Sequence, residues 1–160
     1  MTLFMTLLTI AALVVVDQLI KYWAVTSLAV IGTVPLIPGV FQFTYVENRG
    51  AAFSLLENHQ WLFVCFAIVA VVLIGMALKK NYVQTFLGKI SLLLICAGAI
   101  GNMLDRVVRH FVVDMLHFSL IEFPVFNVAD IYVCVGMALF CFYMLFQHKE
   151  LEDRKEEPHV

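Results

Sequence analysis

Long runs of apolar residues, almost free of charge, recur four times along the chain. They cover residues 3–29, 61–78, 86–104 and 128–146. Each is close to the ~20 residues that an α-helix needs to cross the hydrocarbon core of a bilayer. The first run is too long for the apolar core of a signal peptide and no basic segment precedes it, so we expect a retained helix. The pattern therefore predicts four transmembrane helices.

Basic residues orient these helices, because cytoplasmic loops of membrane proteins are enriched in Lys and Arg. Lys79, Lys80 and Lys89 flank the turn between the second and third runs, and a charged tail at 148–160 follows the fourth. We therefore expect both chain ends on the cytoplasmic side. Two longer loops then face outward.

The outer loops carry a pattern of their own. Residues 41–45 alternate apolar and polar side chains, which is typical of a half-buried strand. The loop at 107–125 is rich in aromatic and β-branched residues, and we expect it to lie on or dip into the membrane surface. The expected fold is an all-α integral membrane protein with four transmembrane helices, a small extracytoplasmic platform containing β-structure, and a short loop helix. We expect residues 1–160 to form one membrane domain.

Composition agrees with this class. Hydrophobic residues make up 62% of the chain and charged residues 14%, whereas a soluble domain is nearer half apolar and a quarter charged. The net charge is −2 and no basic run exceeds two residues, which argues against a nucleic-acid partner. Cys65, Cys96, Cys134 and Cys141 all lie in apolar stretches without a C-x-x-C pair, so we expect small buried hydrophobic residues.

Two aspartates stand at the edges of apolar segments, where a carboxylate is costly. Asp114 follows three apolar residues in the second outer loop, and Asp130 opens the fourth apolar run. A carboxylate at a membrane boundary is a functional-site hypothesis by default. Two of them on the same side of the membrane suggest an acid/base pair that shares one proton.

Some polar residues also have a purely structural interpretation. Asp17 and Lys21 lie one helical turn apart, so an ion pair would lower the cost of burying both. Alternatively, Asp17 supports a site at the outer end of its helix. Asn127 and Asp130 suit an N-cap and the first turn of a helix, although this reading leaves Asp114 unexplained.

Two further polar groups are equally open. Asn48 begins an Asn-x-Gly turn signal. Asn102, Asp105 and Arg106 end the third apolar run, after a face of small residues that permits close helix packing. Asp105 and Arg106 are sequence neighbours and point different ways on a helix, so each needs other partners. The trio either organises a polar site or anchors the helix at the membrane edge.

A metal site is the first chemical alternative. His110, Asp114 and His117 are spaced so that they would share one face of a helix and could bind zinc. The pattern of this stretch is extended, however, which separates them. We therefore expect neither a metal nor a cofactor.

Two other classes of function compete with an enzyme. A small transporter would also place carboxylates in a membrane bundle, but these acidic residues gather at one face and no inverted repeat is visible. A non-catalytic assembly factor could bind a partner helix through Ala97 and Gly101. Motifs of zinc and serine proteases, HExxH and GxSxG, are absent from the sequence.

Five short motifs, taken in order, resemble those of the lipoprotein signal peptidase (signal peptidase II) family. They are Asp17-Gln18 with Lys21, NRGAAF at 48–53, GAIGNMLDR at 98–106, VVD at 112–114 and FNVAD at 126–130. Each motif alone is weak, whereas five in order on a four-span frame of this length are highly specific. The chain departs from the family pattern at Ala97, where glycine is common, and at Met115, where an aromatic residue often follows the aspartate. Residues 116–123 match no motif.

The resemblance implies an aspartic endopeptidase of the bacterial inner membrane that removes signal peptides from prolipoproteins. It would cut just before a cysteine that already carries a diacylglyceryl group, at the outer face of the membrane. Expected partners are this substrate, membrane lipid and globomycin-type inhibitors, and the expected state is a monomer. The resemblance makes Asp114 and Asp130 the catalytic pair. It also implies that the site is lined or braced by Asn48, Asn102, Asp105, Arg106 and Asn127, with Asp17 in support.

Overall fold

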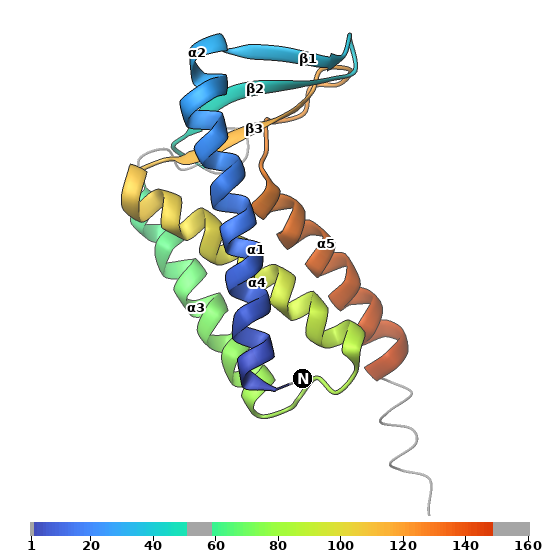
Figure 1. Cartoon of the computed structure of the whole chain (residues 1–160). Coiled ribbons are helices and arrows are strands. Elements are labelled where there is room, and N and C mark those ends of the chain that lie inside the picture. Colours follow the sequence, from blue (N-terminus) through green and yellow to red (C-terminus); the bar gives the residue numbers. More distant parts are fainter. Residues whose placement is uncertain (1, 51–58, 149–160) are drawn as a thin grey trace, which may run out of the picture.

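Four long apolar helices carry a small sheet at one end (Figure 1). The structure is a computed structural model and describes residues 2–50 and 59–148. All four helices are long and apolar enough to cross a membrane. The expected fold class is confirmed. Ala51, Ala52 and Phe53 of the NRGAAF motif and the tail from 149 onward lie outside the described residues, and the described loop residues contain no separate short helix.

The first span is longer than predicted. Helix α1 (Leu3–Trp23) continues through a π-helical segment, η1 (Ala24–Leu28), into α2 (Ala29–Ile31), so the span covers Leu3–Ile31. Gly32 then adopts a φ of 86°, a conformation that side chains bearing a Cβ disfavour. This glycine turns the chain out of the helix and into the sheet.

The other spans match the predicted runs except at one end. They are α3 (Gln60–Lys79), α4 (Phe86–Arg109) and α5 (Val128–Phe142), which continues as η3 (Tyr143–His148). Helix α4 extends five residues beyond the predicted end at 104. Its extra turn places basic side chains at the C-terminus, where the helix dipole favours them. His110 caps this end with a left-handed backbone, φ 64°, and turns the chain toward the sheet.

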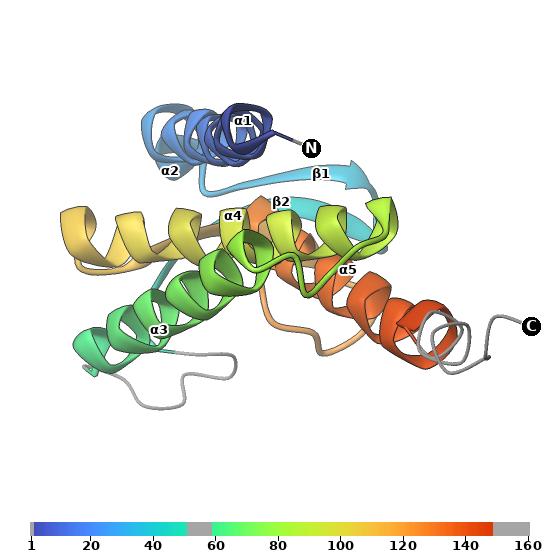
Figure 2. The same ribbon diagram turned by 90° about the horizontal axis from the view of Figure 1, so that it is seen from below.

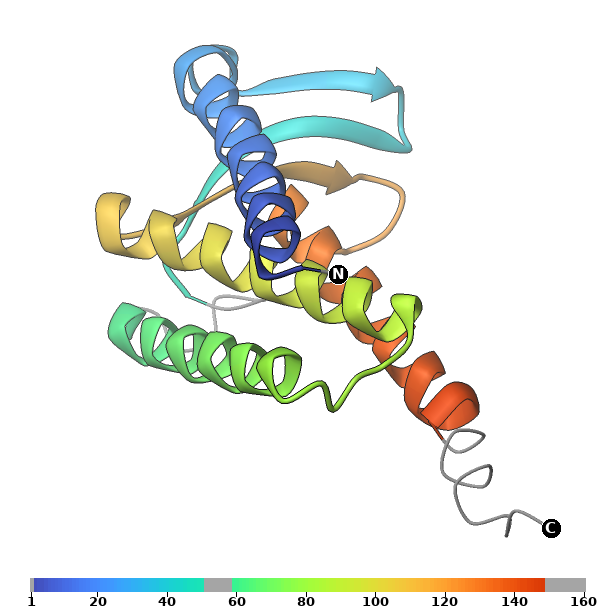
Figure 3. The ribbon, with the colours of Figure 1, turned by 60° about the horizontal axis from the view of Figure 1, so that its bottom comes forward.

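The sheet is antiparallel, with the strand order β1 (Thr33–Ile37), β2 (Phe41–Asn48) and β3 (Val112–Phe118). The predicted strand at 41–45 is therefore confirmed and is three residues longer. The stretch with an extended pattern in the second outer loop forms β3. Figure 3 shows the three strands side by side, next to the end of the first span.

Helix α4 is the centre of the bundle, because α1, α3 and α5 all pack against it (Figure 2). The sheet is fixed to this bundle by Val113 and Met115 of β3, which are buried against Ala24 and Leu28 of the first span. The position of β3 is therefore set by the helices beneath it.

Burial is distributed as expected for a protein in lipid. Most large apolar side chains of α1 and α3 are exposed, whereas Asp17, Lys21, Asp105 and Asn127 are fully buried. The expectation of four buried cysteines is wrong for three, since only Cys96 is buried. Many apolar side chains of α3 and α5 are exposed, and in a membrane they would contact lipid.

Close contact between α4 and α5 depends on Gly98. A Cβ at this position would meet the backbone oxygen of Ala129 and lie 2.7 Å from Val133 Cγ2. We predict that Gly98→Ala lowers the unfolding free energy by roughly 1–3 kcal/mol through overpacking. Gly75→Ala, where a Cβ meets nothing within 4 Å, is the matched control and should be neutral or slightly stabilising. Thermal unfolding in detergent measures both, and equal midpoints for the two variants would contradict the prediction.

Candidate active site

A cavity of about 600 Å³ opens between β3, the loop before α5, and helices α4 and α5. Its polar lining consists of Asn48, Asn102, Arg106, Asp114 and Asp130. The remaining lining is apolar and includes four phenylalanine side chains. Five of the predicted site residues therefore share one cavity, although they come from β2, β3, α4 and α5.

Asp114 lies on β3 and is 1% exposed. It accepts two hydrogen bonds from amide side chains, 2.9 Å from Asn48 Nδ2 and 2.6 Å from Asn127 Nδ2. Burial disfavours the charged form and, with the nearby charge of Asp130, raises the pKa of Asp114 from 3.8 to about 7. Near neutral pH this carboxyl group can hold or release a proton.

Asp130 is the third residue of α5 and belongs to its capping box. The Asn127 backbone N–H donates to Asp130 Oδ2 at 3.1 Å, and the Asp130 N–H donates to Asn127 Oδ1 at 3.0 Å. The other carboxylate oxygen accepts from Asn102 Nδ2 at 2.7 Å. Asp130 can therefore be both a helix-capping residue and a site residue, because the capping box fixes the carboxylate that lines the cavity.

Asn127 thus contacts both aspartates, through its side chain to Asp114 and through its backbone to Asp130. Its side chain also donates to Asn102 Oδ1 at 3.2 Å. Every amide that reaches the two carboxylates presents N–H groups to them. Such hydrogen bonds to charged acceptors are stronger than neutral ones, so the pair is held in a defined geometry.

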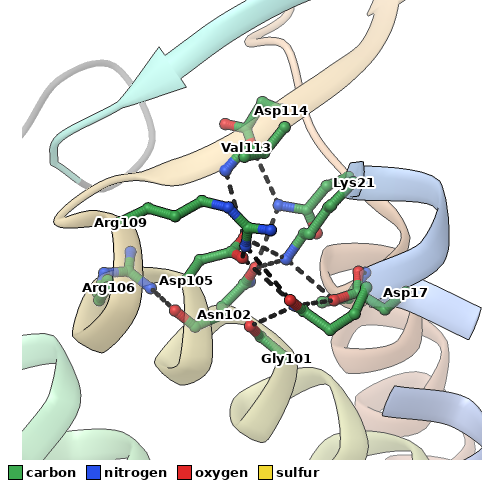
Figure 4. Close-up of polar contacts among 12 residues, drawn as sticks. Asp17, Lys21, Gly101, Asn102, Asp105, Arg106, Arg109, Val113 and Asp114 are labelled. Carbon is green, nitrogen blue, oxygen red and sulfur yellow. Dashed lines mark hydrogen bonds and ion pairs between the residues drawn. The ribbon is translucent and has the colours of Figure 1, made fainter. Parts of the chain in front are cut away.

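A cluster of charged side chains from α1 and α4 lies beside β3, the strand that carries Asp114 (Figure 4). Lys21 Nζ is 3.0 Å from Asp17 Oδ2 and 2.8 Å from Asp105 Oδ2, and all three side chains are fully buried. Arg109, one turn beyond Asp105, forms an ion pair with it. The predicted Asp17–Lys21 pair is present, and the four charges sum to zero. A balanced network is needed here because an isolated charge in an apolar interior costs several kcal/mol.

Asp17 and Asp105 also join segments of the fold. Asp17 Oδ1 accepts from the Ala129 N–H at 2.9 Å, at the start of α5. Asp105 Oδ2 accepts from the Val113 N–H at 3.3 Å, next to Asp114. The alternative that Asp17 supports the site is therefore compatible with its ion pair. Neither residue lines the cavity.

Asn48 and Arg106 complete the polar wall. Asn48 Oδ1 accepts from the Gly50 N–H at 3.0 Å, which is the expected turn, while its amide group reaches Asp114. Arg106 donates to Asn102 O at 3.2 Å and Gly50 O at 3.3 Å, and its guanidinium lies 4.8 Å from the ring centre of Phe63. Within the described part of the chain the buried Arg106 Nε has no partner. Asn48 and Arg106 therefore both stabilise the local backbone and line the cavity.

The residues of the metal alternative are dispersed. His110 ends α4, while His117 Nδ1 lies 3.0 Å from Gln42 Nε2 within the sheet. Across residues 2–50 and 59–148, no group of three or more His, Cys, Asp or Glu side chains is placed to hold a metal ion. The extended strand β3 separates the three candidates, as its sequence pattern indicates.

Two members of the network were not anticipated as part of the site. Gln18 donates to Gly101 O at 3.2 Å and to Asp105 Oδ1 at 3.3 Å, and Arg109 reaches both Gln18 and Asp105. The spacing of Asp105 and Arg109, one helical turn, was a usable signal. It was missed because the predicted helix ended at 104.

These features define a class: an integral membrane enzyme with two carboxylates in a cavity at one end of a helix bundle. The family model for Signal peptidase (SPase) II matches residues 9–146, and the chain belongs to the signal peptidase II family. Its activity is that of a lipoprotein signal peptidase, an aspartic-type hydrolase. The transporter and assembly-factor alternatives are not retained.

Similar proteins cover nearly the whole chain. The chain is 46% identical over 140 residues to the lipoprotein signal peptidase of Clostridioides difficile (strain 630), covering 88% of this chain and 94% of that protein. It is 46% identical over 133 residues to the lipoprotein signal peptidase of Streptococcus thermophilus (strain CNRZ 1066), covering 81% and 85%. These relatives are bacterial, in agreement with a multi-pass protein of the cytoplasmic membrane.

Solved structures share the fold. A bacterial membrane enzyme structure determined by the in meso method at 2.3 Å resolution superposes with a TM-score of 0.84 at 26% identity, covering 99% of this chain and 95% of that chain. A second, at 1.9 Å resolution, gives 0.80 at 27% identity and covers 90% and 94%.

The pKa of Asp114 makes stability depend on pH. Because the folded pKa is raised, the native state holds a proton that the unfolded state releases above about pH 4, so stability falls as pH rises toward 7. The rise from 3.8 to about 7 corresponds to at most ~4 kcal/mol. We predict that Asp114→Asn gains stability relative to the wild type between pH 4 and 7. Unfolding midpoints across this range test the prediction, with exposed Glu122→Gln as control, and parallel profiles for all three proteins would contradict it.

Proposed function

We propose that Asp114 and Asp130 are the catalytic pair that hydrolyses prolipoproteins at the peptide bond just before a diacylglyceryl-modified cysteine. The observation that carries this proposal is the position of both carboxylates in one cavity, with Asn127 hydrogen-bonded to each. The names of the similar lipoprotein signal peptidases support the substrate class.

The chemistry follows from two carboxylates that share a site. Like charges at close range disfavour double ionisation, so the pair holds one proton. The ionised member takes a proton from a water molecule as that water attacks the scissile carbonyl carbon. The protonated member donates its proton to the carbonyl oxygen, which gives a gem-diol. The C–N bond then breaks as the carboxyl group that took the water proton protonates the amine of the new N-terminal cysteine, and one gem-diol hydroxyl returns its proton to the other carboxylate. The pair titrates as a unit, and the steps as written require no metal ion or cofactor.

We place the site at the outer membrane surface, with both termini in the cytoplasm. Lys79, Lys80 and Lys89 lie at the α3–α4 turn, at the opposite end of the bundle from the sheet (Figure 1). Loops rich in Lys and Arg face the cytoplasm. The sheet and the two aspartates then lie at the exterior face, the side to which a signal peptide delivers its cargo.

The cavity suits a substrate that carries lipid. Phe63 of α3 and Ile131, Cys134 and Val135 of α5 form an apolar wall below the aspartates. Ile131 and Val135 are also exposed, so this wall is not sealed by protein and acyl chains of the bilayer could reach it. A diacylglyceryl cysteine can therefore leave its chains in the membrane while its peptide reaches the carboxylates. We expect globomycin-type cyclic peptides to occupy the same cavity, and we expect a monomer to suffice.

The first prediction from this proposal concerns the carboxylates. Asp114→Asn or Asp130→Asn should lower kcat by at least ~10²–10⁴, the range typical of general acid–base groups, and leave a folded, membrane-inserted protein. Gel-shift assays of signal-peptide release by the purified protein measure this. Glu122→Gln, an exposed carboxyl change outside the cavity, is the matched control and should cleave at the wild-type rate. Near wild-type cleavage by either aspartate variant would end the proposed assignment.

The second prediction concerns the lipid. A prolipoprotein with the diacylglyceryl group should be cleaved by the purified protein, whereas the same polypeptide with a free cysteine should be cleaved at least ~100-fold more slowly at equal concentration. The reason is that lipid binding places the scissile bond against the carboxylates, and positioning of this kind contributes several kcal/mol. Equal rates for the two substrates would show that the lipid is not recognised.

A further inference from the structure

We propose that Lys21 is a positioning residue of the reaction, fixing the carboxamide of Asn102 so that its N–H group, and not its oxygen, faces Asp130. This inference rests on the proposed catalytic pair. Sequence patterns favoured an ion pair with Asp17 as the role of Lys21. The structure gives it a third contact, 2.8 Å from Asn102 Oδ1, which an ion pair does not require.

The contacts of Lys21 use all of its donors. The ammonium group has three N–H bonds, and it lies within 3.0 Å of Asp17 Oδ2, Asp105 Oδ2 and Asn102 Oδ1. Its side chain is 0% exposed, so no solvent competes for these bonds. Figure 4 shows Lys21 reaching from α1 toward the side chains of α4. One of the three N–H bonds of Lys21 is therefore directed at a neutral amide next to the carboxylate pair.

Only one orientation of the Asn102 amide satisfies its hydrogen bonds. Asn102 Oδ1 accepts from Lys21 and, at 3.2 Å, from Asn127 Nδ2, while Asn102 Nδ2 donates to Asp130 Oδ1 at 2.7 Å. Turning the amide over would place its NH₂ against two donors and its oxygen against a carboxylate oxygen. Both contacts would be repulsive, and they would leave buried polar groups without partners, which is unfavourable. Lys21 supplies the shorter of the two bonds that prevent this.

The consequence for Asp130 is positional. With Asn102 fixed, each oxygen of Asp130 has one N–H donor, from Asn102 and from the Asn127 backbone. Without Lys21 the oxygen of the Asn102 amide keeps only its longer described contact, from Asn127. The amide is then less firmly held, and so is the N–H group that it presents to Asp130. A displacement of about 1 Å in a reacting group can lower the rate ~10²-fold. Lys21 itself does not line the cavity, so substrate binding should be little affected.

Arg109 provides a matched comparison. It is the other cation of the same cluster and pairs with Asp105, as Lys21 does, but its described partners are Asp105 and Gln18 and not Asn102. Removing either cation unbalances the cluster by one charge. The Arg109 side chain is 24% exposed, whereas that of Lys21 is fully buried. Arg109→Gln therefore controls for the loss of one charge from the cluster, and a variant that removes Lys21 while keeping the cluster neutral controls for its burial.

The test measures kcat and KM with a diacylglyceryl prolipoprotein for Lys21→Met, Arg109→Gln, Asp17→Asn and Asp17→Asn/Lys21→Met. The double variant keeps the cluster neutral, which protects folding if Lys21→Met alone is unstable. We expect kcat of Lys21→Met to be about 10- to 100-fold lower than that of the wild type. We expect kcat of the double variant to be lower than that of Asp17→Asn by the same factor. KM should stay within about threefold in both, and Arg109→Gln should keep kcat within about threefold.

Several outcomes would overturn the inference. These are a double variant with kcat close to that of Asp17→Asn, an equal loss in Arg109→Gln, or a loss confined to KM. Failure of both Lys21 variants to fold would also overturn it, since the lysine would then be needed for folding itself. Asp114→Asn and Asp130→Asn are assayed in parallel. If those two remain active, the proposed catalytic pair fails, whereas their inactivity beside active Lys21 variants would remove only the role given to Lys21.

Discussion

Asn127 joins a strand to a helix at the point where two carboxylates meet one cavity. Its side chain donates to Asp114 on β3 and accepts from the backbone of Asp130 on α5, while its own backbone N–H returns a bond to Asp130. Without these bonds, within the described ranges, Asp114 would keep only its hydrogen bond from Asn48, and Asp130 only its hydrogen bond from Asn102. A buried polar group left unsatisfied costs about 1–3 kcal/mol. The cap that starts α5 is therefore also the device that brings the acids together.

An apolar surrounding explains why the polar network extends so far from the cavity. A charge inside the bundle cannot be solvated by lipid, so each one needs an opposite charge or a set of hydrogen bonds. Lys21, Asp17, Asp105 and Arg109 meet this requirement as a neutral group that ties α1, α4 and the strand beside it. Among the described residues, Asp114 has no opposite charge in contact and is held by two amide side chains instead. Its buried carboxyl has a raised pKa, and this cost in stability is the kind that the proposed catalytic role would explain.

The sequence predicted the spans and the pair of aspartates, because apolar runs and carboxylates at membrane edges are local signals. It predicted a strand at 41–45 from alternation, and the structure extends it to Asn48, whose side chain reaches Asp114. The length of α4 was underestimated because its last turn is polar, and this hid Arg109. The contacts of Lys21 with Asn102 could not be read at all, since they depend on how α1 packs across α4, and no periodicity along one segment reports packing between two.

The shared proton is the central claim, and infrared difference spectroscopy of the purified protein in detergent tests it most directly. The account predicts a protonated carboxyl band in the wild type at pH 6 that fades by pH 8.5, and that is absent from Asp114→Asn at pH 6. A wild-type spectrum without that band at pH 6, with both acids ionised, would contradict it.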